Sequence, residues 1–154
     1  MSAVRSVLVR APGKVNVSMR VGAPMDDGYH DVATAYQAVS LYEELRAERD
    51  TELSLDFSGP ILTGSLPVDR TNLVIRAAHL LQARSGYRGG ARIHVVKRVP
   101  IAGGMGGGSA DAAAALVGLA VIRRVRRGGV RHLALLAVAR DESHVGRRLF
   151  ARVG

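Results

Sequence analysis

The sequence predicts an α+β fold in which helices flank a mixed sheet. Hydrophobic residues make up 47% of the 154 residues, which is enough for the core of one domain. Aromatic residues reach only 4% while there are 18 glycines, a profile more typical of an enzyme domain than of an aromatic-rich binding module. In the middle of the chain an alternating stretch, a run of glycines and an alanine-rich stretch follow one another, which predicts strand, loop and helix.

The first part of the chain is predicted to be mostly strand, because polar and apolar residues alternate there with β-branched character. We expect strands over residues 7–9, 15–19, 33–41 and 52–57. The first two are expected to be separate, since Ala11-Pro12-Gly13 lies between them and Pro-Gly pairs interrupt strands. Asp26-Asp27-Gly28-Tyr29-His30 predicts a turn, and Ser58-Gly59-Pro60 is expected to end the last of these strands.

The second part of the chain alternates between helix and strand. We expect helices over residues 73–83 and 109–120, and a strand over residues 91–97. The first helix has apolar residues at helical spacing and a polar run, 69–72, that can cap its start. Glycines within residues 85–90 are expected to stop it, and the strand that follows places Ile93 and Val95 on one face.

Secretion and membrane insertion are not indicated. The absence of cysteine excludes disulfides, thiolate metal sites and thiol catalysis. Residues 1–10 lack the apolar block of a signal peptide, and no run approaches the roughly 18 apolar residues of a membrane helix. We therefore expect a soluble, cytoplasmic protein without membrane contact.

The net charge of +9 is concentrated at one end of the chain. Nine arginines and two acidic residues lie within residues 122–154, which therefore carry +7, while residues 1–121 carry +2. A basic segment of this kind can bind nucleic acid, with an affinity that falls steeply with salt. Its few aromatic residues and lack of an amphipathic pattern favour a solvated tail over that alternative.

Residues 100–112 form the chemical centre of the sequence. Successive glycines let the backbone approach a polyphosphate and point N–H groups at its oxygens, and the start of a helix adds partial positive charge. A phosphate-binding loop is therefore predicted, although the same residues also fit a flexible turn in which Ser109 only caps the helix. A Walker A motif is excluded because no Gly-Lys-Ser/Thr follows, and dinucleotide binding fits less well because no acid follows residue 120 until Asp141.

Three motifs within residues 4–121 resemble those of the GHMP small-molecule kinases. Residues 100–110 are similar to the family's Pro-x-x-x-Gly-Leu/Met-Gly-Ser/Gly-Ser/Gly-Ser-Ala motif, and residues 11–16 to its first motif. Asp27-Gly28-Tyr29-His30 is similar to the branch that phosphorylates the 2-hydroxyl of 4-diphosphocytidyl-2-C-methyl-D-erythritol in non-mevalonate isoprenoid (terpenoid) biosynthesis. The resemblance implies the fold of the family's N-terminal domain, which is also found in ribosomal proteins, and a need for ATP and Mg²⁺.

The resemblance also implies roles for single residues. Lys14 would approach the acceptor hydroxyl and offset charge as the γ-phosphoryl group moves, with Asn16 beside that hydroxyl. Tyr29 and His30 would hold the cytosine by stacking and by hydrogen bonds. Ser109 would lie nearest the β-phosphate and Mg²⁺. The ATP cradle would consist of Pro100, Ile101, Ala102, Gly103, Gly104, Met105, Gly106, Gly107, Gly108, Ser109 and Ala110.

Two charged residues beside the loop are given no catalytic role. Lys97 precedes the loop and can reach toward a nucleotide, but lysines at strand ends are mostly solvated. Asp111 lies just inside the expected helix, where an acid stabilises the helix dipole.

The sequence departs from the family toward its end. Family members are roughly twice as long and carry a catalytic Asp, the base for the acceptor hydroxyl, in a Gly-Ser/Ala-Asp-Val-Pro-Phe segment. Here the corresponding stretch is Val145-Gly146-Arg147-Arg148-Leu149-Phe150, and Asp141 lies in a different context. We therefore expect a domain over residues 1–121, an Arg-rich segment over 122–154 and no C-terminal domain.

A frame shift after about residue 121 would explain this departure. The codons GCC-GAC-GTC for Ala-Asp-Val contain CGA-CGT one base over, which encodes Arg-Arg. The gene's DNA tests this expectation, because it requires a Gly-x-Asp-Val-Pro sequence in an alternative frame. The chain is accordingly interpreted as an incomplete kinase, with another GHMP small-molecule kinase, a basic nucleic-acid-binding fragment or a non-catalytic fragment as alternatives.

Overall fold

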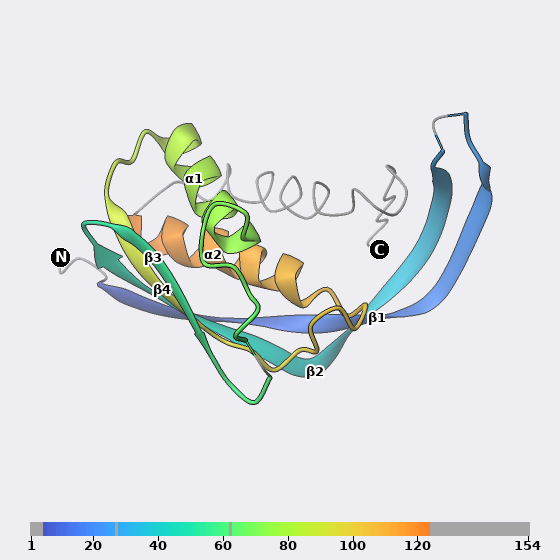
Figure 1. Cartoon of the computed structure of the whole chain (residues 1–154), viewed down its shortest axis with the longest axis horizontal. Helices are drawn as coiled ribbons and strands as arrows, with labels where there is room; N and C mark the ends of the chain where they lie inside the picture. Colours follow the sequence, from blue (N-terminus) through green and yellow to red (C-terminus); the bar gives the residue numbers. More distant parts are fainter. Residues whose placement is uncertain (1–4, 27, 62, 124–154) are drawn as a thin grey trace.

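The protein is described by a computed structural model for residues 5–26, 28–61 and 63–123, and these residues form one mixed sheet with two helices (Figure 1). The elements are β1 (Ser6–Pro24), β2 (His30–Asp50), β3 (Leu53–Ser58), α1 (Leu73–Ser85), β4 (Gly90–Val96) and α2 (Gly107–Arg123). The strand order is β1-β2-β4-β3, with β3 parallel to β4 and the other neighbours antiparallel. The predicted α+β class is confirmed.

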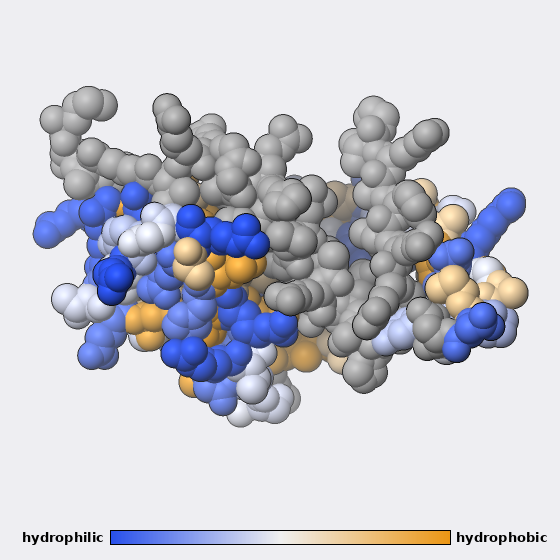
Figure 2. Space-filling model, turned by 90° about the horizontal axis from the view of Figure 1, so that it is seen from above, coloured by the Kyte–Doolittle hydropathy of each residue, from blue (hydrophilic) through white to orange (hydrophobic). Residues whose placement is uncertain are grey.

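Both helices lie on the same side of the sheet, while β1 and β2 extend well beyond the other strands as a two-stranded ribbon (Figure 1). The far end of this ribbon curves toward the side on which the helices lie. Seen from above, apolar and hydrophilic residues lie next to one another at that end (Figure 2). Val17, Met19 and Val21 are among its exposed apolar side chains.

The expected break at Ala11-Pro12-Gly13 is wrong, because β1 continues through it. Pro12 pairs with Tyr42 but Lys14 with Ala38, so the register shifts and the pairing is irregular at this point. A proline fits here because β1 is an edge strand of the sheet. The Pro-Gly pair therefore lies within one continuous strand at an irregularity of the pairing, where one residue of β1 faces three of β2. The strand expected over residues 33–41 is part of the longer β2.

The other predicted elements are confirmed, with shifted ends. The turn between β1 and β2 is closed by a hydrogen bond from Met25 N to Tyr29 O (2.7 Å). Asn72 caps α1, because its side chain accepts a hydrogen bond from Val74 N. Gly86 ends this helix in the left-handed conformation, with φ 68°, and donates its N–H to Gln82 O.

The core lies between the sheet and the two helices. Alternation directs every second side chain toward the helices in β4 and in β2 over residues 43–47. The small residues of α2 allow close packing, since a Cβ added at Gly118 would lie 3.4 Å from Val7 and Val9 on β1. The largest fully buried apolar side chains include Leu45, Leu81, Ile93, Leu116, Leu119 and Ile122. Each stabilises the fold by roughly 1.5–3 kcal/mol, and together they support both sides of the segment between β4 and α2.

Candidate nucleotide and acceptor site

The glycine-rich loop between β4 and α2 has a strongly curved backbone. Ala102, Gly104 and Gly106 all have positive φ, at 58°, 70° and 71°. Glycine adopts this conformation freely, whereas it strains an alanine. Helix α2 begins at Gly107, two residues before the predicted start, so Ser109 is the third helical residue and not the cap.

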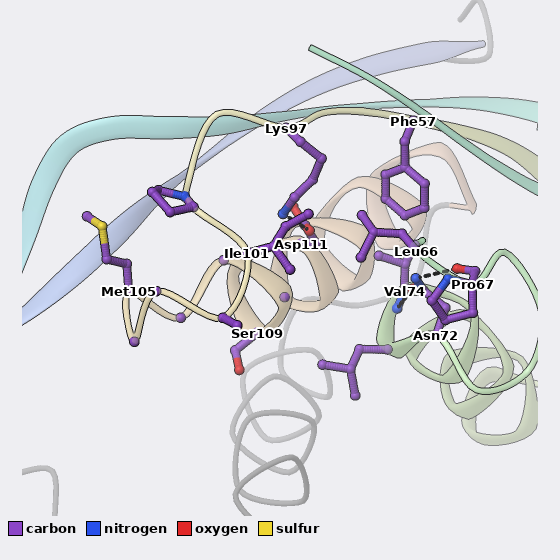
Figure 3. Close-up of a pocket in the computed structure, with 18 of the residues that line it drawn as sticks. Phe57, Leu66, Pro67, Asn72, Val74, Lys97, Ile101, Met105, Ser109 and Asp111 are labelled. Atoms are coloured by element: carbon purple, nitrogen blue, oxygen red, sulfur yellow. Dashed lines mark hydrogen bonds and ion pairs between the residues drawn. The ribbon is translucent and has the colours of Figure 1, made fainter. Parts of the chain in front are cut away.

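A cavity of about 360 Å³ lies between this loop and the start of α1 (Figure 3). Every predicted cradle residue from Pro100 to Ser109 lines it, whereas Ala110 packs against the hydrophobic core. Apolar side chains of Phe57, Leu66 and Val74 gather at one side, away from the glycines (Figure 3). The cavity thus has an apolar end and an end formed by backbone N–H groups and a helix N-terminus.

Asn72 lines the cavity, a role that the sequence did not predict. Its Oδ1 accepts from Val74 N, and its Nδ2 donates to Pro67 O, both at 2.8 Å. One side chain therefore caps α1 and fixes the segment before it. The capping signal was visible in the sequence, but its place beside the glycine loop depends on the packing of α1 against α2.

Lys97 is buried, so the expectation that it is solvated is wrong. Its Nζ donates to Glu43 Oε1 at 2.5 Å and to Asp111 Oδ2 at 2.7 Å. The other oxygen of Glu43 accepts from Arg98 N at 2.8 Å. Asp111 is the fifth residue of α2, beyond the first turn, so its partner is Lys97 and not the free N–H groups at the helix start.

Burial raises the pKa of Asp111 to about 6, since the charged form loses its hydration. The neighbouring Lys97 ammonium counteracts this increase in the pKa, and the negative charge of Glu43 adds to it. Asp111 Oδ1 is buried and has no hydrogen-bond partner among the described residues. Lys97 and Asp111 therefore form part of the buried wall of the cavity, whereas Glu43 does not line it.

Lys14 lies where the ribbon meets the glycine loop. Its backbone N donates to Met105 O at 2.9 Å, and its side chain passes close to Gly106. The Nζ donates to Asn16 Oδ1 at 2.8 Å and lies 4.7 Å from the centre of the Tyr36 ring. The structure thus brings Lys14 and Asn16 together beside the loop, and adds Tyr36, which the sequence analysis did not single out.

Thr34 fixes the orientation of Asn16. Its hydroxyl donates to Ser18 O (2.7 Å), because a carbonyl can only accept, and it accepts from Asn16 Nδ2 (2.8 Å). The amide oxygen of Asn16 consequently faces the Lys14 ammonium.

Tyr29 and His30 lie at the other end of the ribbon. His30 Nδ1 donates to Gly22 O at 2.9 Å, and both side chains are half-buried. Ala38, the pairing partner of Lys14, lies eight positions after His30 in β2, which is about 26 Å along the strand. A ligand that contacts both Lys14 and His30 must therefore lie along the ribbon.

Comparison with known proteins assigns the family. Residues 72–144 match the family described as GHMP kinases N terminal domain, and this range includes α1, β4, the whole glycine loop and α2. A 4-diphosphocytidyl-2-C-methyl-D-erythritol kinase from Leifsonia xyli is 57% identical over 86% of this chain and 44% of its own length. The chain has the N-terminal domain of a GHMP kinase.

Further relatives agree with this assignment. The protein of the same name from Clavibacter michiganensis is 59% identical over 72% of this chain and 36% of its own length. A crystal structure of 4-(cytidine 5'-diphospho)-2C-methyl-D-erythritol kinase is 36% identical with a TM-score of 0.65, over 85% of this chain and 46% of that one. Homoserine kinase from Cytophaga hutchinsonii, at 18% identity and a TM-score of 0.64, shares the fold. The chain spans less than half the length of these relatives.

The GHMP domain carries a second polar arrangement on the exposed face of its sheet. Ser58 Oγ lies 2.8 Å from His94 Nε2, and His94 Nδ1 lies 3.0 Å from Asp56 Oδ2. This order of groups resembles a hydrolase triad. The side chains of His94 and Asp56 are 36% and 66% exposed, and neither lines the cavity, so we assign no activity to them.

No helix within the described residues of the GHMP domain is long and apolar enough to cross a membrane. In the same part of the chain no three His, Asp or Glu side chains form a metal-binding group. Ile122 and Arg123, the first two residues of the Arg-rich segment, end α2, whereas residues 124–154, with Asp141 and the stretch over 145–150, lie outside the described residues. Asp27 of the turn lies outside them too. The boundary near residue 121 and the frame shift stay predictions.

Proposed function

We propose that this domain holds ATP for the phosphorylation of 4-diphosphocytidyl-2-C-methyl-D-erythritol, at its 2-hydroxyl. The observation that carries the proposal is the hydrogen bond from Lys14 N to Met105 O, which joins the glycine loop to the strand bearing Lys14 and Asn16. The names of the relatives at 57% and 59% identity support this choice of substrate.

The nucleotide is proposed to lie with its base at one end of the cavity and its phosphates at the other. Its base takes the apolar end beside Phe57 and Leu66, where stacking and burial stabilise an aromatic ring. Its phosphates take the end formed by residues 103–109, where backbone N–H groups and the α2 dipole attract negative charge. This placement puts the terminal phosphate toward Lys14.

Magnesium is proposed to bind with the phosphates at Ser109. The Ser109 side chain lines the cavity in the first turn of α2, and Mg²⁺ keeps several waters and binds substrate phosphates, so a single protein hydroxyl fits its needs. Bound there, the ion would neutralise charge on the phosphates. The protein's own contribution is to hold the phosphates and to keep the Ser109 hydroxyl beside them.

Lys14 is the proposed catalytic residue of the domain. Phosphoryl transfer spreads negative charge over the moving group, and a fixed ammonium stabilises that charge. Asn16 and the Tyr36 ring hold the Lys14 ammonium beside the loop before substrate arrives. Tyr29 and His30 are proposed to hold the cytosine at the far end of the ribbon, which suits an elongated diphosphate substrate.

Two measurements test the proposal. Calorimetric titration of the chain with ATP and Mg²⁺ should detect binding that Lys14→Ala changes by less than about threefold. Any phosphorylation of the acceptor that the wild-type chain performs should fall about a hundredfold in that variant. Arg84→Ala, which removes an exposed cation from the last turn of α1, is the matched control and should leave both values unchanged. Absence of ATP binding in the wild-type chain would contradict the proposal.

A further inference from the structure

The Glu43–Lys97–Asp111 cluster joins three parts of the chain around the glycine loop. Lys97 lies directly after β4 and before the loop, whereas Asp111 follows the loop in α2. Glu43 comes from β2, and its second oxygen accepts from Arg98 N, the first amide of the loop. The ion pair between Lys97 and Asp111 therefore closes the loop at its two ends.

The three side chains of the cluster are buried. Lys97 is 2%, Glu43 0% and Asp111 4% exposed. A Cβ added at Gly107 would lie 3.1 Å from Glu43 Oε1, so the glycine at the start of α2 leaves room for this carboxylate. Because desolvation offsets much of the attraction in a buried ion pair, such a group stabilises a fold weakly but fixes its geometry through several short hydrogen bonds.

The loop needs such a restraint. Ala102 has a φ of 58°, a strained conformation that persists only when its surroundings hold it. The hydrogen bond from Lys14 N to Met105 O holds the middle of the loop. The cluster holds both ends, at Arg98 and at the first turns of α2.

We propose that Lys97 is a positioning residue, which clasps the ends of the glycine loop through Glu43 and Asp111 and so keeps the loop in its phosphate-binding conformation. Lys97 lines the cavity, but its side chain is only 3% exposed and its Nζ is bound to Glu43 and Asp111, so we assign its action to the loop. The effect on affinity rests on the proposed ATP binding, while the clasp itself does not.

The first test is hydrogen exchange of the loop amides. In Lys97→Met, exchange over residues 98–110 should become about tenfold faster, since opening of the loop needs less free energy. Exchange over the ribbon, residues 15–37, serves as the internal control and should not change. Lys97→Arg keeps a cation with several donors and should restore slow exchange in the loop.

A second variant distinguishes loss of the loop restraint from unfolding of the whole chain. Lys97→Met leaves two buried carboxylates without a cation, which can unfold the chain. The triple variant Glu43→Gln, Lys97→Met, Asp111→Asn removes all three charges at similar volume and is expected to stay folded by circular dichroism. It lacks the clasp all the same, so its loop amides should exchange as fast as those of folded Lys97→Met.

ATP titration completes the design. If only a tenth of the triple-variant molecules have the loop in its phosphate-binding conformation, their ATP affinity falls about tenfold. In Lys97→Arg the ATP affinity should recover. Loop exchange unchanged in the triple variant overturns the clasp, and faster exchange with unchanged affinity overturns its role in binding. If the wild type binds no ATP but exchange responds as expected, the clasp stands and the proposed function fails.

Discussion

At the scale of single residues, Asp111 makes the stability of the domain depend on pH. Its pKa rises from 3.8 to about 6 on folding, because burial disfavours the charged form more than Lys97 favours it. The folded state therefore binds this proton more tightly than the unfolded chain does. The resulting stabilisation is complete below pH 3.8 and is lost as the pH rises through about 6.

Asp111→Asn removes this dependence and is the variant to compare. As the pH falls from 7 to 4, the unfolding free energy of the wild type should increase relative to Asp111→Asn, by on the order of 2 kcal/mol. Urea unfolding at several pH values measures it, and the comparison cancels the titration of all other groups. A difference between the two proteins that stays constant with pH would contradict the raised pKa.

At the scale of elements, the start of α1 combines a structural and a binding role in Asn72. Asn72→Ala removes the acceptor for Val74 N and should cost about 1 kcal/mol of stability. It also frees the segment at Pro67 on the cavity wall, so ATP affinity should fall with it. Thermal unfolding and ATP titration measure the two effects.

Asn72→Asp separates them. Aspartate caps a helix as well as asparagine does but offers no N–H to Pro67 O. Stability should therefore recover in Asn72→Asp while ATP affinity stays reduced. Equal ATP affinity in all three proteins would show that the contact to Pro67 does not shape the site.

The elements also show what the sequence could and could not predict. α1 was predictable because its limits are local: Asn72 and Gly86 satisfy the backbone groups at its two ends. The continuity of β1 was not, since Ala11-Pro12-Gly13 reads as a break until the irregular pairing with β2 is known. Local pattern fixes a helix end, whereas a bulge depends on the partner strand.

The candidate site divides in the same way. That residues 100–109 line one cavity follows from their contiguity in the chain, and their role as an ATP cradle stays a prediction. The rest of the cavity wall was not predictable, because Phe57, Leu66 and Asn72 come from separate segments. The burial of Lys97 was not predictable, because Glu43, whose carboxylate pairs with its ammonium group, lies 54 residues earlier in the chain.

At the scale of the whole molecule, the two candidate sets of site residues lie on parts of the fold that differ in stability. The glycine loop is held by the core between the sheet and the helices, where Leu45 and Ile93 are fully buried. Tyr29 and His30 sit on the two-stranded end of the ribbon, which carries exposed Val17 and Met19 and lies away from the helices (Figure 1). Within the part of the chain that the structure describes, no helix covers this end of the ribbon, and a two-stranded ribbon alone opens easily.

Native-state hydrogen exchange should therefore divide the chain into two parts. Amides of Leu45 and Ile93 should exchange only through global unfolding, with the free energy of unfolding measured in urea. Amides over residues 18–35 should exchange at least about a hundredfold faster, by local opening. Because Tyr29 and His30 are proposed to hold the cytosine, cytidine diphosphate should slow exchange in this ribbon and leave the core unchanged, while ATP with Mg²⁺ should slow the glycine loop. Equal protection of ribbon and core would contradict the division, and a ribbon that ignores cytidine diphosphate would contradict the role given to Tyr29 and His30.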